Sequence, residues 1–166
     1  MSAPSDETLM ALCAAGSDTA FAALVERHSP AVYRYFHVTC RDRELAWDLV
    51  QETFLRIHKH RARYQPGARF RNWLFVIAAN LARSDRRARL RRPSMPSLGD
   101  LDVPNQAIGP EQAAVDAERL VRIRAALERL PPAQSAALRL RLLKGLDFEA
   151  IGRALSCPTA TARTRV

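Results

Sequence analysis

The sequence has few of the features that mark secreted or membrane-bound proteins. Only three of its 166 residues are cysteines, Cys13, Cys40 and Cys157, and they lie far apart. An odd and scattered set makes a disulfide framework unexpected and favours a reducing compartment. No apolar run approaches the roughly 18 residues of a membrane span, and the N-terminus lacks the basic and apolar regions of a signal peptide. We therefore expect a cytoplasmic protein with no membrane insertion.

Catalytic signatures are missing as well. Glycine is scarce, with six residues, and there is no Gly-rich phosphate loop, no Gly-x-Ser-x-Gly and no His-Glu-x-x-His. No segment alternates apolar and polar residues as a strand would, and no tandem repeat is present. We expect an all-α protein that is not an enzyme, with no catalytic residue, no cofactor and no metal site.

Positive charge is abundant and unevenly distributed. The chain has 26 Lys and Arg against 17 Asp and Glu, a net charge of +9. Residues 1–82 carry +2, residues 83–92 carry +5, residues 93–118 carry −5 and residues 119–166 carry +7. A strongly basic protein attracts polyanions, largely through counterion release. Two basic blocks around an acidic spacer indicate a polyanion binder with two binding regions.

The most informative segment, residues 69–92, combines a helical stripe with a run of arginines. Its apolar positions recur at helical spacing: Trp73, Leu74, Ile77, Ala78 and Leu81. Six arginines and one aspartate follow between Arg83 and Arg92. A charge run alone is usually a solvated face, but the arginine bias and the nearby aromatic residues favour nucleic acid.

Composition divides the chain into two helical parts. Residues 93–110 are rich in proline, small and acidic residues and have no sustained periodicity, which is typical of a linker. We expect two small helical domains, residues 1–92 and 111–166, joined by a flexible acidic linker and mobile in the free protein. In the first domain, Asp18 or Thr19 is expected to cap a helix, and Pro30 to mark a helix restart.

The end of the chain has the pattern of a helix-turn-helix. Residues 136–144 predict a helix that Gly145 ends. Asp147 is expected to cap a short second helix, and Ser156-Cys157-Pro158 to form a tight turn. The polar and basic residues 159–166 then predict the recognition helix. Small helical hairpins are common, and this pattern alone does not establish DNA binding. The basic segment at 83–92 strengthens that interpretation.

Three segments resemble, in order, motifs of the extracytoplasmic-function (group IV) sigma factors of the sigma-70 family. Residues 48–56, Asp-Leu-Val-Gln-Glu-Thr-Phe-Leu-Arg, resemble the polymerase-binding signature. Residues 70–87 resemble the segment that melts the promoter and reads the −10 element. Residues 130–165 resemble the helix-turn-helix that reads the −35 element. The resemblance covers nearly the whole chain and implies a factor that directs core RNA polymerase to specific promoters, under an anti-sigma factor or a C-terminal sensory extension.

The resemblance also implies the residues that act at each site. Core polymerase would be bound by Asp48, Leu49, Val50, Gln51 and Glu52, with Leu49 also holding the helix to its own core. The −10 residues would be Tyr64, Arg69, Phe70, Asn80, Arg83, Arg86 and Arg87. Tyr64 and Phe70 would stack on a flipped base or belong to the core, and Trp73 is expected in the core. The −35 residues would be Thr159, Thr161, Arg163, Thr164 and Arg165.

The second domain departs from the family pattern. Ala162 stands where the family usually has a branched apolar residue, and Gly152 replaces a usual alanine. The chain also stops at Val166, inside the expected recognition helix, so we expect this domain to be truncated.

Two other functions fit parts of the sequence. One is a one-component helix-turn-helix DNA-binding regulator, which has no need to bind core polymerase. The other is a metal-responsive interaction protein that uses His37, Cys40 and Cys157; His37 and Cys40 have metal-ligand spacing, but two ligands do not make a site.

Overall fold

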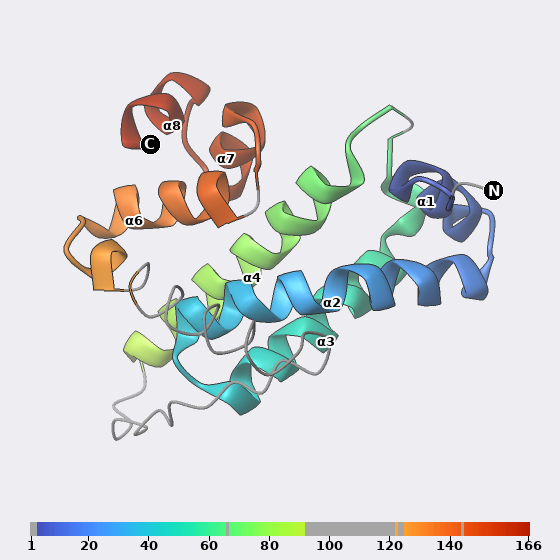
Figure 1. Cartoon of the computed structure of the whole chain (residues 1–166), viewed down its shortest axis with the longest axis horizontal. Helices are drawn as coiled ribbons and strands as arrows, with labels where there is room; N and C mark the ends of the chain where they lie inside the picture. Colours follow the sequence, from blue (N-terminus) through green and yellow to red (C-terminus); the bar gives the residue numbers. More distant parts are fainter. Residues whose placement is uncertain (1–2, 66, 92–121, 123–124, 144) are drawn as a thin grey trace.

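The computed structural model describes residues 3–65, 67–91, 122, 125–143 and 145–166. The described residues contain helices and no strand, which confirms the all-α fold (Figure 1). The elements are α1 (Asp6–Ala14), α2 (Asp18–Cys40), α3 (Arg43–Lys59), η1 (Arg61–Arg63), α4 (Phe70–Arg91), α6 (Pro132–Leu138), the π-helical turn η2 (Arg139–Leu143), α7 (Phe148–Leu155) and α8 (Thr159–Arg165). The expected linker at 93–110 lies outside the described residues.

Side-chain oxygens cap four of these helices at their N-termini. Each accepts a backbone N–H three residues on: Ser5 from Thr8 at 3.1 Å, Ser17 from Ala20 at 3.2 Å, Asp42 from Leu45 at 3.0 Å and Asp147 from Ala150 at 2.7 Å. The cap expected at Asp18 or Thr19 is therefore Ser17. Asp18 instead lies in the first turn of α2, where its charge complements the helix dipole.

Pro30 does not restart a helix, because α2 runs through it without a break. Proline has a helical φ but lacks an N–H, so it removes one backbone hydrogen bond from the helix interior. The residues around it compensate by burial: Leu24, Val32 and Phe36 are fully enclosed. Tertiary packing thus holds α2 together until Arg41, which adopts the left-handed conformation with φ 59°.

The first helical half is built around α2, which contacts α1, α3 and α4. Helices α3 and α4 also contact each other, so the three long helices enclose a common core (Figure 1). Its fully buried side chains include Phe36, Ile57, Phe70, Leu74 and Phe75. This packing directs one face of α4 inward and leaves the opposite face to other partners.

The second half contains α6, η2, α7 and α8. The helix expected at 136–144 is instead α6, which begins at Pro132, followed by the wider turn η2. Leu140 and Leu146 are both fully buried. Packing of these side chains in the small core therefore outweighs the tendency of α6 to continue as a regular α-helix. Gly145 has φ 63° and ends the turn as expected. The cap at Asp147 and the turn at 156–158 are likewise confirmed.

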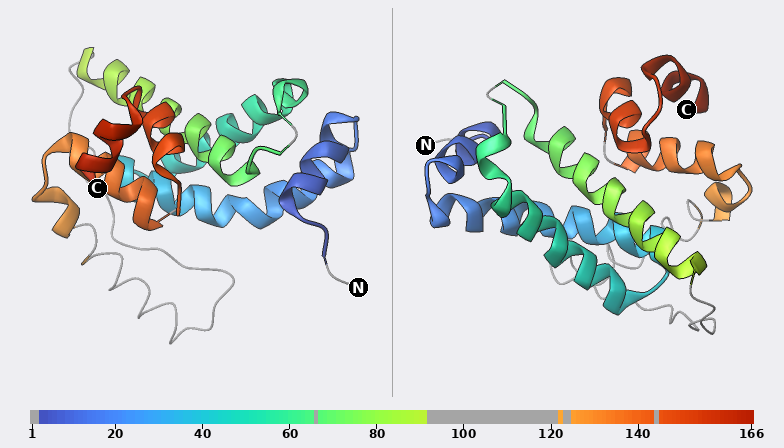
Figure 2. Two further views of the ribbon diagram at one scale, coloured as in Figure 1. Left: turned by 90° about the horizontal axis from the view of Figure 1, so that it is seen from above. Right: turned by 180° about the vertical axis from the view of Figure 1, so that it is seen from behind.

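The two halves are in contact with each other in this structure. Helix α7 packs against α4, as both views of Figure 2 show. Buried side chains from both halves belong to one hydrophobic cluster. The second half therefore covers part of the first, and this contact bears on the functional surfaces below.

Candidate nucleic-acid interface

Helix α3 presents a polar outer face. Its inward residues include Leu49 and Val50, which are buried. Leu49 therefore packs in the core, as expected of a residue that holds the helix to its own domain, and Val50 is buried beside it, so neither side chain lies on the surface of the free protein. Asp48 and Gln51 are exposed and Glu52 is partly exposed, so three of the five expected residues lie outward.

Two apolar side chains lie on the same outer face, and the sequence reading missed them. Trp47 is 45% exposed and Leu55 is 64% exposed. The spacing of Trp47, Gln51 and Leu55 is four residues, which aligns them on a helix. The ring of Trp47 packs on Tyr33 with centroids 4.6 Å apart, so it is held in place. Trp47 and Leu55 could have been found in the sequence by their positions, which fall outside the apolar stripe that the helix buries.

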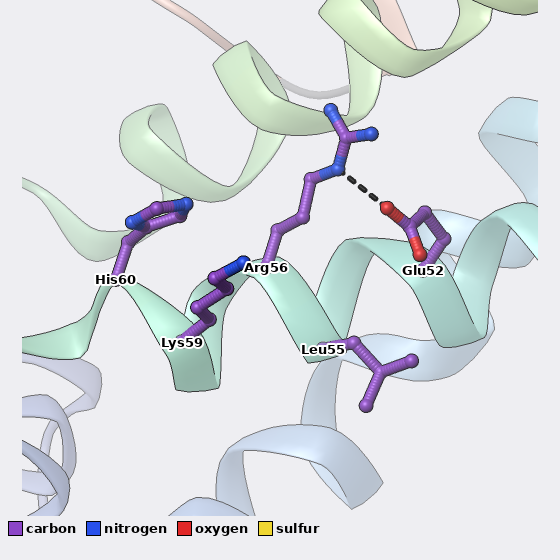
Figure 3. A pocket seen from close by; sticks show the side chains of 5 residues that line it. All are labelled: Glu52, Leu55, Arg56, Lys59 and His60. Carbon is purple, nitrogen blue, oxygen red and sulfur yellow. Dashed lines mark hydrogen bonds and ion pairs between the residues drawn. The ribbon is translucent and has the colours of Figure 1, made fainter.

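A shallow hollow of about 380 Å³ adjoins this face, at the C-terminal end of α3. It is lined by Glu52, Leu55, Arg56, Lys59 and His60 (Figure 3). Glu52 and Arg56 form an ion pair 2.6 Å long one helical turn apart. Figure 3 shows Leu55 pointing away from that pair. The surface thus combines an apolar anchor with charges of both signs, which suits a protein partner.

Tyr64 and Phe70, the two residues expected to stack on a base, lie in different environments. Phe70 is fully buried, so it is a core residue and is not available to stack on a base. Tyr64 is partly exposed, and its ring centroid lies 5.4 Å from that of Trp73. The Tyr64 hydroxyl donates to the carbonyl of Ala68, which fixes the loop in which Arg69 is exposed. Trp73 packs against the core, as expected, but is only partly buried, so part of its ring remains accessible.

The C-terminal part of α4 carries the arginines. Asn80, Arg86 and Arg87 are exposed. Arg83 is partly buried, and its guanidinium donates both to Asn80 and, at 3.1 Å, to the hydroxyl of Ser156. Arg89 pairs instead with Asp85 at 3.1 Å. The structure therefore leaves Arg86 and Arg87 directed to solvent while Arg83 is engaged within the protein.

Helix α8 exposes most of its polar residues. Thr159, Arg163 and Thr164 are exposed, whereas Thr161 and Arg165 are partly buried. Arg163 lies over the ring of Phe148, 5.6 Å from its centroid. Cation–π contact of this kind orients a guanidinium without neutralising it. The polar face of α8 is therefore accessible and partly ordered in advance.

Ala162 and Gly152, the two residues that depart from the family pattern, have a steric explanation. Ala162 is fully buried, in the core between α8 and its neighbours, where a small side chain is accommodated. A Cβ added to Gly152 would lie 2.8 Å from the carbonyl oxygen of Cys157. This distance is shorter than real Cβ contacts, so the close approach of α7 to the following turn favours glycine.

The metal-responsive alternative gains no support from the described residues. They contain no group of three or more His, Cys, Asp and Glu placed to hold a metal ion. Burial raises the pKa of the Cys40 thiol to about 12, which keeps it protonated and opposes metal ligation. None of the described helices combines the length and hydrophobicity needed to cross a membrane.

Comparisons with known proteins agree with this architecture. The family model described as Sigma-70 region 2 matches residues 24–92, which include α3 and α4. The model described as Sigma-70, region 4 matches residues 120–166, which include α7 and α8. The order of the two matches is that of the two helical halves.

Individual relatives support the same assignment. The chain is 37% identical over 145 residues to the ECF RNA polymerase sigma factor SigE of Mycolicibacterium smegmatis, covering 86% of this chain but only 56% of the length of that relative. It is 35% identical over 150 residues to the RNA polymerase sigma factor CarQ of Myxococcus xanthus, covering 90% of this chain and 84% of CarQ.

Solved structures show the same fold. The structure of CnrH in complex with the cytosolic domain of CnrY has a TM-score of 0.68 at 23% identity, covering 97% of this chain and 89% of that one. The sigma factor RpoE of Bartonella quintana, solved with the anti-sigma factor NepR, has a TM-score of 0.67 at 22% identity, covering 88% of this chain and 89% of that one. Taken with the sequence relatives, these findings place the chain in the sigma-70 family of RNA polymerase sigma factors, in its extracytoplasmic-function group.

Proposed function

We propose that this chain is an alternative sigma factor, which binds core RNA polymerase and directs it to specific promoters. It acts in the cytoplasm and has no catalytic activity of its own. The observation that carries the proposal is family membership together with the outer face of α3, where the polar residues of the expected polymerase signature are exposed on a helix held by its own core.

Core polymerase is bound by the outer face of α3. Asp48, Gln51 and Glu52 supply polar contacts, and the exposed Trp47 and Leu55 supply the apolar anchors. Interfaces of this kind gain most of their affinity from a few buried apolar or aromatic side chains surrounded by polar ones. The burial of Leu49 and Val50 supports a structural role for them, since they fix the helix beneath the contact surface.

The −10 element is melted and read by α4 and the loop before it. Arg86 and Arg87 are exposed and suited to backbone phosphates, whereas Asn80 has an amide that can pair with a base edge. Extruding a base costs a few kcal/mol, which stacking must recover. Tyr64 and Trp73 are the partly exposed rings near Arg69 that could provide it.

The −35 element is read by α8. In a helix-turn-helix, the second helix enters the major groove with its N-terminal residues at the base edges. The exposed hydroxyls of Thr159 and Thr164 and the guanidinium of Arg163 are the accessible polar groups of α8. Thr161 and Arg165, which are partly buried, lie at the margin of this surface.

An anti-sigma factor is the regulator that this architecture suits best. Two proteins of the same fold have been solved with a bound partner: CnrH with the cytosolic domain of CnrY, and RpoE with the anti-sigma factor NepR. In the present chain, a polypeptide that covered Trp47 and Leu55 would compete directly with polymerase for the outer face of α3.

The test is binding to free core polymerase followed by transcription in vitro. The double variant Gln51→Ala/Glu52→Ala should lose most of its affinity for core enzyme with unchanged helical content. Gln134→Ala/Glu26→Ala changes the same residue types at exposed positions elsewhere and should bind as the parent does. A parent protein that binds DNA but not core polymerase would establish the alternative, a one-component helix-turn-helix regulator.

A further inference from the structure

Helix α1 takes no part in the polymerase and DNA contacts proposed above, yet it reaches the start of α4. The carboxylate of Glu7 accepts the backbone N–H of Phe70 at 3.3 Å, across 63 positions of the chain. Phe70 is the first residue of α4, and the first N–H groups of a helix have no acceptor within that helix. Glu7 therefore caps α4 from a different helix.

The residue before α4 cannot supply this cap from its side chain. The carbonyl of Arg69 accepts the N–H groups of Asn72 at 3.0 Å and of Trp73 at 3.3 Å, so Arg69 stands at the N-terminal boundary of the helix. Helices usually have Ser, Thr, Asp or Asn at this boundary, because a side-chain oxygen can accept an N–H of the first turn. The guanidinium of arginine has only donors. The carboxylate of Glu7 provides the missing acceptor, and its charge also suits the positive end of the helix dipole.

The turn of α1 that carries Glu7 is fixed to α2 by the preceding residue. One carboxylate oxygen of Asp6 lies 2.7 Å from the guanidinium of Arg27, and the other lies 2.8 Å from the ring of His28. Arg27 also donates to the carbonyl of Pro4 at 3.0 Å. These contacts hold the start of α1 against α2, so Glu7 is presented to α4 from a supported position.

The same group of residues borders the loop that precedes α4. Helix α1 contacts both η1 and α4, the elements on either side of that loop (Figure 1). The ring of His28, which Asp6 holds, lies 5.3 Å from the ring of Phe70. Burial raises the pKa of the Tyr64 phenol, and the nearby charges of Glu7 and Asp6 raise it further. The two carboxylates of α1 therefore lie close to both ends of the loop.

We propose that Glu7 is a positioning residue for −10 recognition, which fixes the start of α4 and thereby the groups that meet the melted strand. The inference rests on the proposed role of α4 and its preceding loop. The rings of Tyr64 and Trp73 each lie 6.4 Å from that of Phe70, the residue that Glu7 holds. Arg69 directly precedes Phe70 in the chain. A shift of the first turn of α4 would move all three of these groups together.

The sign of the effect separates positioning from simple charge. A carboxylate beside a DNA surface repels phosphates, so its removal should by itself tighten binding to any DNA sequence. Loss of a positioning contact should instead reduce the preference for the correct −10 sequence. Glu7 is exposed, so its truncation leaves no cavity in the core.

Three variants of the full chain distinguish these roles. Glu7→Ala removes both the acceptor and the charge. Glu7→Gln removes the charge but keeps a carbonyl oxygen at the same distance along the side chain, so it can still accept the N–H of Phe70. Glu26→Ala removes a carboxylate from an exposed position of α2 and serves as the charge control.

The probe is a single-stranded DNA library randomised at the −10 positions, bound to holoenzyme and sequenced. The ratio of affinities for the sequences that the parent enriches most and least measures discrimination. Glu7→Ala should lower this ratio about fivefold, within the range for loss of a helix cap. Glu7→Gln should stay within about twofold of the parent, since a neutral acceptor retains much of the bond. Affinity for core polymerase should be the same in all variants.

Amide hydrogen exchange in the free protein gives a readout that does not depend on DNA or polymerase. Exchange at residues 70–73 should accelerate in Glu7→Ala and remain near the parental rate in Glu7→Gln and Glu26→Ala. Helical content should be unchanged in all three variants, because the substitutions lie at exposed positions.

Several results would overturn the positioning role. Parental discrimination or parental exchange in Glu7→Ala would show that the cap does not hold the start of α4. Equal losses in Glu7→Ala and Glu7→Gln would assign the effect to charge and not to the hydrogen bond. If the parent itself did not bind core polymerase, the proposed function would fail, and this role in promoter reading with it, whereas exchange at residues 70–73 would still show whether Glu7 caps α4.

Discussion

Gly152 lies so close to the carbonyl oxygen of Cys157 that a Cβ at residue 152 would be only 2.8 Å from it. The backbone N–H of Cys157 also donates to the carbonyl of Gly152 at 3.0 Å. This double contact joins α7 to the turn that precedes α8. The carbonyl oxygen of Cys157 belongs to the backbone and not to a flexible side chain, so moving it aside would distort the turn. The close approach of Gly152 to this turn therefore helps to set the position of α8.

Gly152→Ala should therefore destabilise the protein despite its better helix propensity. In open space the change would add up to about 1 kcal/mol of stability, whereas overpacking at a tight contact costs about 1–3 kcal/mol. We expect a net loss in the free energy of unfolding, measured by urea denaturation. Glu149→Ala, at an exposed position of the same helix, should change stability by no more than about 0.5 kcal/mol. A stabilised Gly152→Ala variant would contradict this geometry.

Leu55 should matter for polymerase binding while a comparable exposed leucine does not. Leu55 is 64% exposed on α3 and Leu12 is 49% exposed on α1. Leu55→Ser should weaken binding to core polymerase by about 1–2 kcal/mol, as expected for a contact residue at an interface, because it removes an apolar anchor. Leu12→Ser should leave affinity unchanged. Equal effects of the two substitutions, in a titration of core enzyme, would rule out the outer face of α3 as the specific contact.

Asn80 and Arg87 should have different effects on promoter binding. Asn80→Ala should lose discrimination at one −10 position, by about 1–3 kcal/mol. Arg87→Ala should weaken all sequences alike and reduce the salt slope by about one; Arg86→Ala should do the same. Binding of holoenzyme to promoter variants at several salt concentrations separates the two effects. Uniform loss across all variants for Asn80→Ala would argue against base reading by this residue.

Stability should fall on mild acidification because of His28. The ring nitrogen of His28 lies 2.8 Å from the carboxylate of Asp6, yet burial lowers the pKa of His28 below its usual value of 6.5 and outweighs the attraction of Asp6. The folded state therefore binds this proton less well than the unfolded state. Its contribution to stability is complete above pH 6.5 and is lost as the pH falls toward the lower folded pKa.

The measurement is the free energy of unfolding between about pH 7.5 and 5, a range that includes the usual histidine pKa of 6.5. His28→Gln should be less stable at pH 7 because the buried ring is lost, and its stability should fall less between pH 7 and 5 than that of the parent. A parallel pH dependence in the two proteins would show that another group is responsible.

Most of the local structure and the family membership follow from the amino-acid sequence alone. The capping of α7 by Asp147, the break at Gly145 and the turn at 156–158 follow from side-chain and backbone preferences that act within a few residues. The apolar residues around 48–56 recur at helical spacing, which favours a helix there. Those features depend only on residues that are close together in the chain, so they can be predicted from the sequence.

Which of the predicted site residues are exposed to a partner depends on how the helices pack together. Leu49, Val50 and Phe70 belong to motif segments, but packing against other helices buries them. Pro30 lies inside α2 because surrounding burial outweighs one lost hydrogen bond. The contact of α7 with α4, through Asn72 and Asp147, joins residues 75 positions apart. No local preference encodes such a contact, since it arises from the complementarity of two surfaces that form only when each half has folded.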